Sequence, residues 1–432
     1  MSRVVINRES LNETSVFISR ISIILVLYLI LDSLLPQSLH RVSIIICTLL
    51  FTGVLNQTKM FQVLKNRVSK YAFEINEIKE IKIDPSRHDL VSSIYDIKEY
   101  LPNAQKWNNR RRILFRKMTG LQQQLARSTK YTEKLNTVDK YFERNNTILS
   151  TIVEEAIKRH NIEDFELKMI EKQAESSKRN NYFRVVESLC HYARDWSVKP
   201  NDEIIPLLRY IKNQTMPLND KNTTVIVPGS GLGRVAHTLA SEMNFSSVHA
   251  IEFSWLMTLM NEFMYLKSGI NDSLNVYPYL HTYSNHFKTA DQLRPVQIQH
   301  SLEKPSNLNI HTEDFTKFAI AEHLETGQDP ENVVFVTCFF LDTAENLVEY
   351  IQAINRISGS FKGVKKWINV GPLKYGTAAQ IELSDEELKL LVESMGWKIT
   401  DEQEPELLGY LTDKKGLWQG YYNVSKWTAT RD

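Results

Sequence analysis

The stretch TTVIVPGSGLGR, residues 223–234, decides the fold. Its first five residues are a short β-branched run, which predicts a buried strand, and residues 234–243 predict a helix. Between them lie Gly229, Gly231 and Gly233. Glycines at such a turn allow positive φ, and they let a ligand approach the backbone closely because no Cβ intrudes. The stretch therefore predicts a strand, a ligand-binding turn and a helix in succession.

An acidic residue, Glu252, ends the next predicted strand, residues 247–251. In a doubly wound sheet, a carboxylate at this point lies beside the glycine turn and can accept hydrogen bonds from both hydroxyls of a ribose. A dinucleotide fingerprint requires glycine or alanine three residues after Gly231, where this chain has Arg234. The arginine disfavours a nicotinamide oxidoreductase. The pattern predicts a nucleoside-containing cofactor, and S-adenosylmethionine is favoured.

Strands and helices alternate beyond residue 200, which predicts an α/β fold with a doubly wound parallel sheet. Further strands are expected at residues 333–339, 367–370, 397–400 and 421–427. Between residues 60 and 200 the chain contains almost no glycine and predicts successive polar helices. We therefore expect a helical region over residues 60–200, followed by the sheet domain over residues 201–432.

The first 59 residues contain two apolar stretches, residues 16–31 and 42–55, separated by a turn with Pro36. A two-helix membrane hairpin explains both stretches, although each is shorter than the roughly 20 residues that a spanning helix needs. Basic residues flank the pair on both outer sides, so both ends would face the cytoplasm. The alternatives are two buried core helices, or a start site placed upstream of the native Met60.

Composition excludes several classes of protein. The 432 residues include 52 Lys+Arg and 51 Asp+Glu, so no basic excess indicates a nucleic-acid binder. A hydrophobic share of 42% and a charged share of 24% indicate a globular chain rather than a disordered one. Cys47, Cys190 and Cys338 form no C-x-x-C pair, which disfavours disulfides and structural zinc and fits a reducing compartment.

Six motifs resemble the carnosine N-methyltransferase family, a group of N2227-like S-adenosylmethionine-dependent methyltransferases. They are ARDWS (193–197), VPGSGLGR (227–234), LHTYSNHFKTADQLRPV (280–296), TCFFLDTAENLVEYI (337–351), WINVGPL (367–373) and IELSDEELKLLVESMGW (381–397). The similarity runs from about residue 90 to about residue 426. It implies a class I, Rossmann-like methyltransferase sheet, preceded here by the helical region and the N-terminal hydrophobic hairpin. It also implies methyl transfer to an imidazole nitrogen of carnosine, giving anserine, or of a related histidine-containing dipeptide or peptide.

The resemblance implies a set of cofactor-binding residues. Gly229 lies under the cofactor, Glu252 binds its ribose, and Arg194 contacts it from the helix before the sheet, at its carboxylate. The family usually has glutamine three residues before that arginine, whereas this chain has His191. The remaining positions are the adenine-binding pair Asp314 and Phe315 and the cofactor-lining Cys338. From the residues alone, Asp314 is a helix N-cap and Cys338 a buried strand residue.

The resemblance also implies that Asp342 binds the imidazole of the substrate and acts in catalysis. On spacing alone, Asp342 suits equally well the cap of the following helix. A carboxylate that accepts the imidazole N–H fixes the tautomer and stabilises the cationic product ring, so no metal or covalent nucleophile is needed. Tyr410 and Tyr422 match two tyrosines of the family's substrate pocket; amphipathic packing is the alternative role for each.

One departure bears on the substrate: the family has a tyrosine–histidine pair where this chain has Tyr375 and Gly376. An alternative function is therefore a catalytically inactive, membrane-tethered interaction protein with a methyltransferase fold. The chain keeps Gly229, Glu252, Asp314 and Asp342, which argues against an inactive protein. We expect an imidazole substrate and no nucleic-acid partner. We also expect membrane contact through residues 16–55 and a homodimer contact. The catalytic domain is expected in the cytoplasm or nucleus.

Overall fold

The computed structural model describes residues 8–34, 40–56, 83–199, 201–267, 273–323 and 331–432. The chain divides into two units, Met1–Ile83 and Asp84–Asp432. In the first unit, the two apolar stretches form helices α1 (Arg8–Leu34) and α2 (His40–Asn56), which contact each other. The expected proline turn and the outer basic residues other than Arg8 lie outside the described residues. None of the described helices is both long and apolar enough to cross a membrane, so the expected spanning hairpin is not supported.

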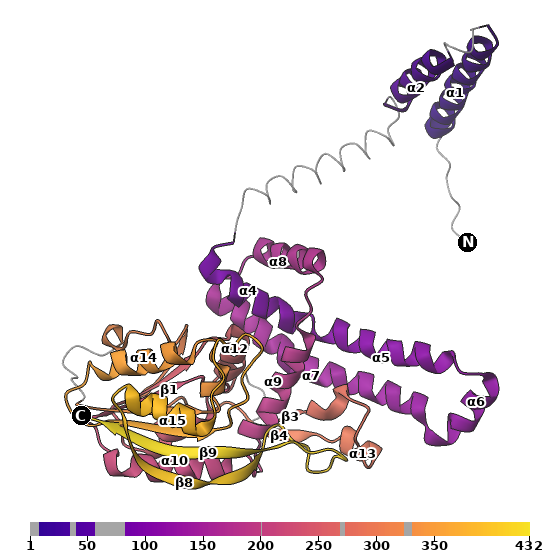
Figure 1. The fold of residues 1–432 in the computed structure, drawn as a ribbon. Coiled ribbons are helices and arrows are strands. Elements are labelled where there is room, and N and C mark those ends of the chain that lie inside the picture. Colours follow the sequence, from indigo (N-terminus) through magenta and orange to yellow (C-terminus); the bar gives the residue numbers. More distant parts are fainter. Residues whose placement is uncertain (1–7, 35–39, 57–82, 200, 268–272, 324–330) are drawn as a thin grey trace. The chain divides into compact units, whose positions relative to one another are not determined.

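The second unit contains a seven-stranded sheet in the order β5-β2-β1-β6-β7-β9-β8 (Figure 1). Five strands are parallel, and β9 pairs antiparallel with both β7 and β8. A separate antiparallel ribbon joins β3 and β4. The strands are β1 (Thr223–Pro228), β2 (Ser247–Glu252), β3 (Ser273–Val276), β4 (Val296–Gln299), β5 (Leu308–Thr312), β6 (Asn332–Cys338), β7 (Lys365–Gly371), β8 (Lys398–Gly409) and β9 (Tyr421–Arg431).

Both faces of the sheet are buried, as its unbroken apolar strands predict. Along β1, Val225 and Val227 face the layer that includes α10 and α11, whereas Ile226 faces the layer that includes α14 and α15. The prediction of a doubly wound α/β sheet is therefore confirmed. The helices that accompany the sheet are α10 (Ile205–Thr215), α11 (Arg234–Glu242), α12 (Trp255–Phe263), α13 (Thr289–Gln292), α14 (Leu347–Ser358) and α15 (Asp385–Ser394).

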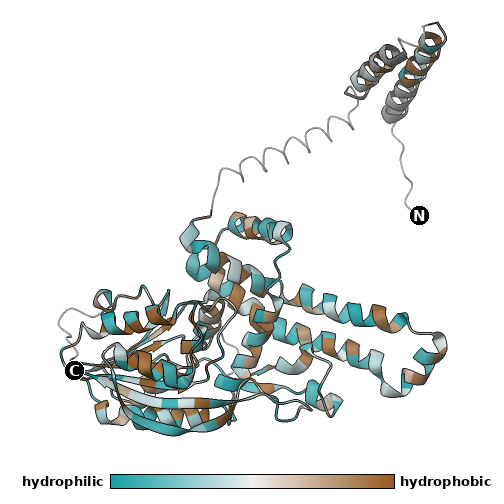
Figure 2. Ribbon diagram, in the orientation of Figure 1, coloured by the Kyte–Doolittle hydropathy of each residue, from teal (hydrophilic) through white to brown (hydrophobic). Residues whose placement is uncertain are grey.

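The expected helices before the sheet are present over the described part of that region. They are α4 (Pro85–Lys98), α5 (Tyr100–Arg116), α6 (Gly120–Leu125), α7 (Tyr131–His160), α8 (Asp164–Ser177) and α9 (Tyr182–Asp195). Figure 2 shows alternating hydrophilic and hydrophobic bands along α5 and α7, which is typical of helices that bury one face. Helix α9 leads to the carboxyl end of the sheet. There Trp196, the residue that directly follows the helix, donates a hydrogen bond from Nε1 to the Leu232 carbonyl at 2.9 Å.

Candidate cofactor and substrate site

The turn after β1 has the backbone geometry that its glycines predict. Gly229, Gly231 and Gly233 all have positive φ, at 63°, 55° and 76°. A Cβ on Gly229 would overlap the ring of Phe340, and a Cβ on Gly233 would lie 2.5 Å from the Asn261 amide nitrogen. Glycine is therefore required at these two positions by both conformation and space.

Replacing Gly233 by alanine is expected to destabilise the fold. The left-handed conformation and the Asn261 contact together should lower the free energy of unfolding by about 1–3 kcal/mol. Gly120→Ala is the matched control, because no atom lies within 4 Å of its added Cβ. Urea denaturation should find the control unchanged or slightly more stable. Equal stability of the two variants would contradict the requirement for glycine at residue 233.

Glu252 lies at the end of β2, directly beside the turn. One carboxylate oxygen accepts the Gly231 N–H at 2.8 Å, and the other accepts the Ser254 N–H at 2.9 Å. Burial raises the pKa of Glu252, while the Ser254 and Gly231 hydrogen bonds oppose the shift. Each carboxylate oxygen has a second acceptor site. The carboxylate is thus fixed in position and still able to bind hydroxyl groups.

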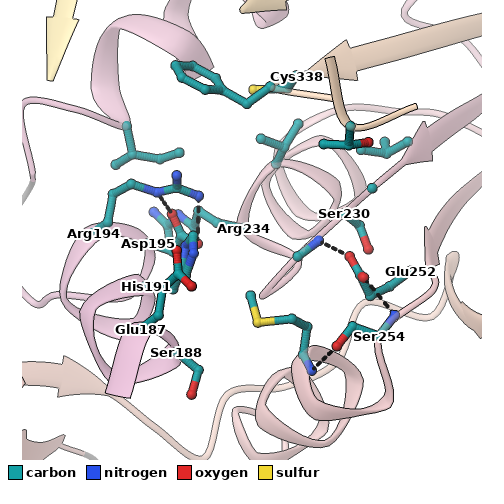
Figure 3. Close-up of a pocket in the computed structure, with 18 of the residues that line it drawn as sticks. Glu187, Ser188, His191, Arg194, Asp195, Ser230, Arg234, Glu252, Ser254 and Cys338 are labelled. Atoms are coloured by element: carbon teal, nitrogen blue, oxygen red, sulfur yellow. Dashed lines mark hydrogen bonds and ion pairs between the residues drawn. The ribbon is translucent and has the colours of Figure 1, made fainter. Parts of the chain in front are cut away.

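A buried ion pair at the end of α9 faces this turn. Arg194 donates to both oxygens of Asp195, at 2.6 and 3.2 Å, and its guanidinium lies 5.2 Å from the centre of the Tyr410 ring. The pKa of Arg194 is raised: burial opposes the charge, but Asp195 more than compensates. Figure 3 shows Arg194 and Asp195 on one side of the pocket, and Glu252 and Ser254 on the other.

These groups line one cavity of about 380 Å³, a size typical of small-molecule sites. Of the expected site residues, the cavity wall contains His191, Arg194, Gly229, Glu252, Cys338 and Tyr410. Burial lowers the pKa of His191 to about 4, and burial raises the pKa of Cys338 to about 12. The imidazole and the thiol are therefore both neutral at pH 7. Arg234 lines the cavity as well, with its guanidinium 5.1 Å from the Trp196 ring.

The cavity wall presents polar atoms suited to a nucleoside bearing an amino-acid group. His191 Nδ1 and Ser230 Oγ are buried and have no hydrogen-bond partner among the described residues. Orphaned polar atoms of this kind are costly unless a ligand pairs with them. Together with the open glycine turn and the Arg194 cation, they fit S-adenosylmethionine.

Asp314 and Phe315 follow β5, whose Thr312 pairs in register with Glu252. Neither residue lines the cavity described above. Asp314 Oδ1 accepts hydrogen bonds from the N–H and the hydroxyl of Thr316, at 2.9 and 2.7 Å. Phe315 is buried against Phe340 and Tyr350. The helix expected after Asp314 is not present, because residues 315–317 form a turn, so Asp314 caps a turn and is not a helix N-cap. Adenine binding by the pair stays a prediction.

Asp342 lies just beyond β6, in a single 3₁₀ turn, Leu341–Thr343. Its side chain does not line the cavity, but its neighbour Thr343 does. Asp342 is 9% exposed, and its carboxylate accepts the Lys374 N–H at 2.9 Å. Burial raises the pKa of Asp342, and the Lys374 hydrogen bond opposes the shift. Asp342 is thus held by backbone at the carboxyl edge of the sheet.

The chain reaches Asp342 through a strained residue. Phe339 has φ 52°, the left-handed region, which is costly for an aromatic side chain and typical of functional sites. A Cβ at Gly371 would lie 3.0 Å from the Phe339 nitrogen, so this close approach requires glycine in β7. The Phe339 ring lies in the cavity wall, and Asp342 follows three residues later in the chain.

Both expected tyrosines gather at this edge. Phe339 stacks on Tyr410 with ring centres 5.2 Å apart, and Tyr422 lies 6.2 Å from Tyr410. Buried Glu203 holds the loop after Tyr410 by accepting the N–H groups of Leu411 and Thr412, at 2.9 and 2.8 Å. Tyr410 and Tyr422 therefore lie together, and Tyr410 is next to Arg194.

Sequence reasoning missed the supporting groups Asp195 and Glu203. Adjacent residues do not face each other on a regular helix, so Arg194 followed by Asp195 gave no signal of an ion pair. Glu203 precedes the sheet by a long stretch of chain and contacts a loop more than 200 residues later. No spacing rule links two such positions.

The sheet order, the antiparallel β9 between β7 and β8, and the glycine turn facing Glu252 define the class: a Rossmann-like methyltransferase fold. A family model described as carnosine N-methyltransferase matches residues 171–432. The chain belongs to this family of S-adenosylmethionine-dependent N-methyltransferases.

Individual relatives agree with the family match. The carnosine N-methyltransferase of Rattus norvegicus is 30% identical over 333 residues, 73% of this chain and 78% of that protein. That of Schizosaccharomyces pombe is 30% identical, over 57% of this chain and 70% of that protein. An uncharacterized protein of Saccharomyces cerevisiae is 32% identical over 58% of this chain, which spans 55% of the yeast protein's length.

Solved structures match more distantly. A methyltransferase from Anabaena variabilis is 9% identical, with a TM-score of 0.34, over 58% of this chain and 93% of that chain. The fold assignment therefore rests on the strand order of the sheet and on the family match.

Proposed function

We propose that this chain transfers a methyl group from S-adenosylmethionine to an imidazole nitrogen of carnosine, giving anserine, or of a related histidine-containing dipeptide or peptide. The observation that carries the proposal is the convergence of Gly229, Glu252, Arg194 and Tyr410 on one cavity, whose wall also includes Thr343, the residue that follows Asp342. The family match supplies the reaction class. Nothing in the comparisons supports the inactive scaffold.

The cofactor side of the cavity would act through fixed contacts. S-adenosylmethionine supplies a sulfonium methyl group that is already activated for transfer. Glu252 would accept the ribose hydroxyls, and Arg194 would bind the carboxylate in place of part of its contact with Asp195. Because these groups are held by backbone and by a buried ion pair, they are preorganised for binding.

The substrate side would act through orientation. Asp342 would accept the imidazole N–H, which leaves the lone pair of the other ring nitrogen directed at the methyl group. As the ring becomes cationic on methylation, the carboxylate stabilises the transition state more than the neutral substrate. Tyr410, Tyr422 and Phe339 would enclose the ring. The test is transfer of a labelled methyl group to carnosine, histidine and histidine-containing peptides.

The affinity for S-adenosylhomocysteine, the demethylated cofactor, is expected to depend on pH through Glu252. Its pKa is raised by burial. As pH falls through that raised pKa, the carboxylate gains a proton and loses acceptor capacity, so affinity should fall as the pH is lowered from neutral into the acidic range. Titration calorimetry across this range measures the effect. Glu252→Gln should bind weakly at every pH, and an equal slope in that variant would assign the titration to another group.

Gly376 offers a direct test of substrate identity. No atom lies within 4 Å of a Cβ added there, so a larger side chain fits. Because the resemblance places a substrate-binding histidine at this position, Gly376→His is expected to raise kcat/KM for carnosine by about tenfold, the value of one good hydrogen bond. Gly376→Ala controls for the backbone change. A rise in both variants, or in neither, would show that residue 376 does not bind carnosine.

A further inference from the structure

Three side chains, one at the end of the edge strand β5 and two after it, form a cluster that the methyl-transfer site does not use. The ligand atoms of His311, Glu313 and His323 lie within 4.8 Å of one another. His311 Nδ1 lies 3.9 Å, and His323 Nε2 3.7 Å, from the same oxygen, Glu313 Oε1. The His311, Glu313 and His323 side chains are 12%, 34% and 31% exposed. The cluster is therefore shielded on one side and open to an ion from solvent.

The two imidazole rings are held in position by neighbours. His323 stacks on buried Phe318, with ring centres 5.1 Å apart and an interplanar angle of 5°. His311 stacks on His249 of β2, and His311 Nε2 lies 3.0 Å from His249 Nδ1. His249 Nε2 lies 3.1 Å from Ser247 Oγ.

This chain of contacts has one tautomer pattern that leaves His311 ready to bind a metal. His249 Nε2 donates its hydrogen to Ser247 Oγ, so His249 Nδ1 is an acceptor and takes the hydrogen of His311 Nε2. His311 Nδ1 then presents a free lone pair to the cluster. Metal-binding histidines almost always donate their second ring N–H to a neighbour in this way.

The local charges also favour a cation. Glu322 and Asp314 lie close to Glu313. Lys304 lies close to His311, and Lys317 pairs with Asp314 at 3.4 Å. The cluster is therefore surrounded by three carboxylates, Glu313 included, and two lysines.

We propose that His311, Glu313 and His323 form a binding site for a divalent transition-metal ion of the zinc type, with water as the fourth ligand. Two histidines and one glutamate are a ligand set that zinc accepts. Tetrahedral zinc separates its nitrogen and oxygen ligands by about 3.3 Å, and rotation of the half-buried Glu313 side chain closes the observed gaps. The ion would tie the end of β5 to His323. None of the three ligands lines the cofactor cavity, so the site is separate from methyl transfer.

Zinc binding to the untagged, metal-stripped, full-length chain tests the proposal. Titration calorimetry with zinc chloride should find one ion per chain, and cobalt(II) should give the visible absorption of a tetrahedral site. Glu313→Gln and His323→Phe should each weaken zinc binding by at least about tenfold. His323→Phe keeps the ring stacking on Phe318, so its fold should persist, as circular dichroism will verify.

His88→Ala is the control, because His88 is a partly exposed histidine on α4 that lies outside the cluster. This variant should bind zinc as the unsubstituted chain does. Zinc should also raise the melting temperature of the unsubstituted and His88→Ala chains, since a ligand specific to the folded state stabilises it. Absence of saturable binding, or equal affinity in Glu313→Gln, His323→Phe and the control, would overturn the proposal.

Discussion

Replacing Asp342 by asparagine is expected to lower kcat/KM for methyl transfer to carnosine by roughly 10²–10³-fold, the cost of removing one preorganised group that stabilises developing charge. Asparagine retains the shape of the side chain and an oxygen to accept the Lys374 N–H. It loses the negative charge that opposes the cationic ring. Steady-state kinetics with labelled cofactor measures the change.

Cofactor binding separates this effect from damage to the site. S-adenosylhomocysteine should bind the Asp342→Asn variant as tightly as the unsubstituted chain, because Asp342 lies beyond the cofactor cavity wall. Asp385→Asn is the matched control, since Asp385 lies on α15 and pairs with Lys389. Full activity in Asp342→Asn would rule out its catalytic role.

Replacing Arg194 by methionine is expected to reduce both stability and cofactor affinity. Asp195 is 4% exposed, and Arg194 is its hydrogen-bond partner, so the substitution leaves a buried carboxylate unpaired. Breaking a buried pair in this way costs about 3–5 kcal/mol of the free energy of unfolding. Loss of a charged hydrogen bond to the cofactor carboxylate should weaken S-adenosylhomocysteine binding at least about tenfold.

The double variant Arg194→Met/Asp195→Leu distinguishes the two roles of the arginine. Replacing both members of a buried pair by apolar side chains is often neutral for stability. We expect chemical denaturation to find stability restored to within about 1 kcal/mol, while calorimetry finds cofactor affinity still reduced. Recovery of affinity together with stability would mean that Arg194 acts only by supporting the fold.

The strands that carry the chemistry were predictable because each is a short, largely buried run. The expected strand at residues 223–227 is β1, and the expected strand ending in Glu252 is β2. Strand β5 was missed, since an edge strand of sequence LNIHT is polar and only half-buried. The expected strand at residues 397–400 is only the beginning of β8, whose charged continuation contains Pro405 and shifts register between Gln403 and Glu406.

Within the site, the sequence predicted the residues whose positions follow from the strand or turn that they belong to. Gly229 and Glu252 face each other because β1 and β2 are neighbouring parallel strands. Asp195 and Glu203 act through contacts that only the tertiary fold creates, so no local pattern predicts them. His311 and His323 are likewise brought together by the chain's return after β5, and neither belongs to a metal-binding motif in the sequence.

Methyl transfer to carnosine is the measurement that tests most directly whether this chain is an imidazole N-methyltransferase. The purified full-length chain is mixed with methyl-labelled S-adenosylmethionine and carnosine, and the product is located by mass spectrometry and nuclear magnetic resonance. We predict one methyl group on an imidazole nitrogen of carnosine, or of another histidine-containing peptide in parallel reactions, and its loss in Asp342→Asn. Cofactor binding without transfer to any imidazole substrate would contradict the proposed function.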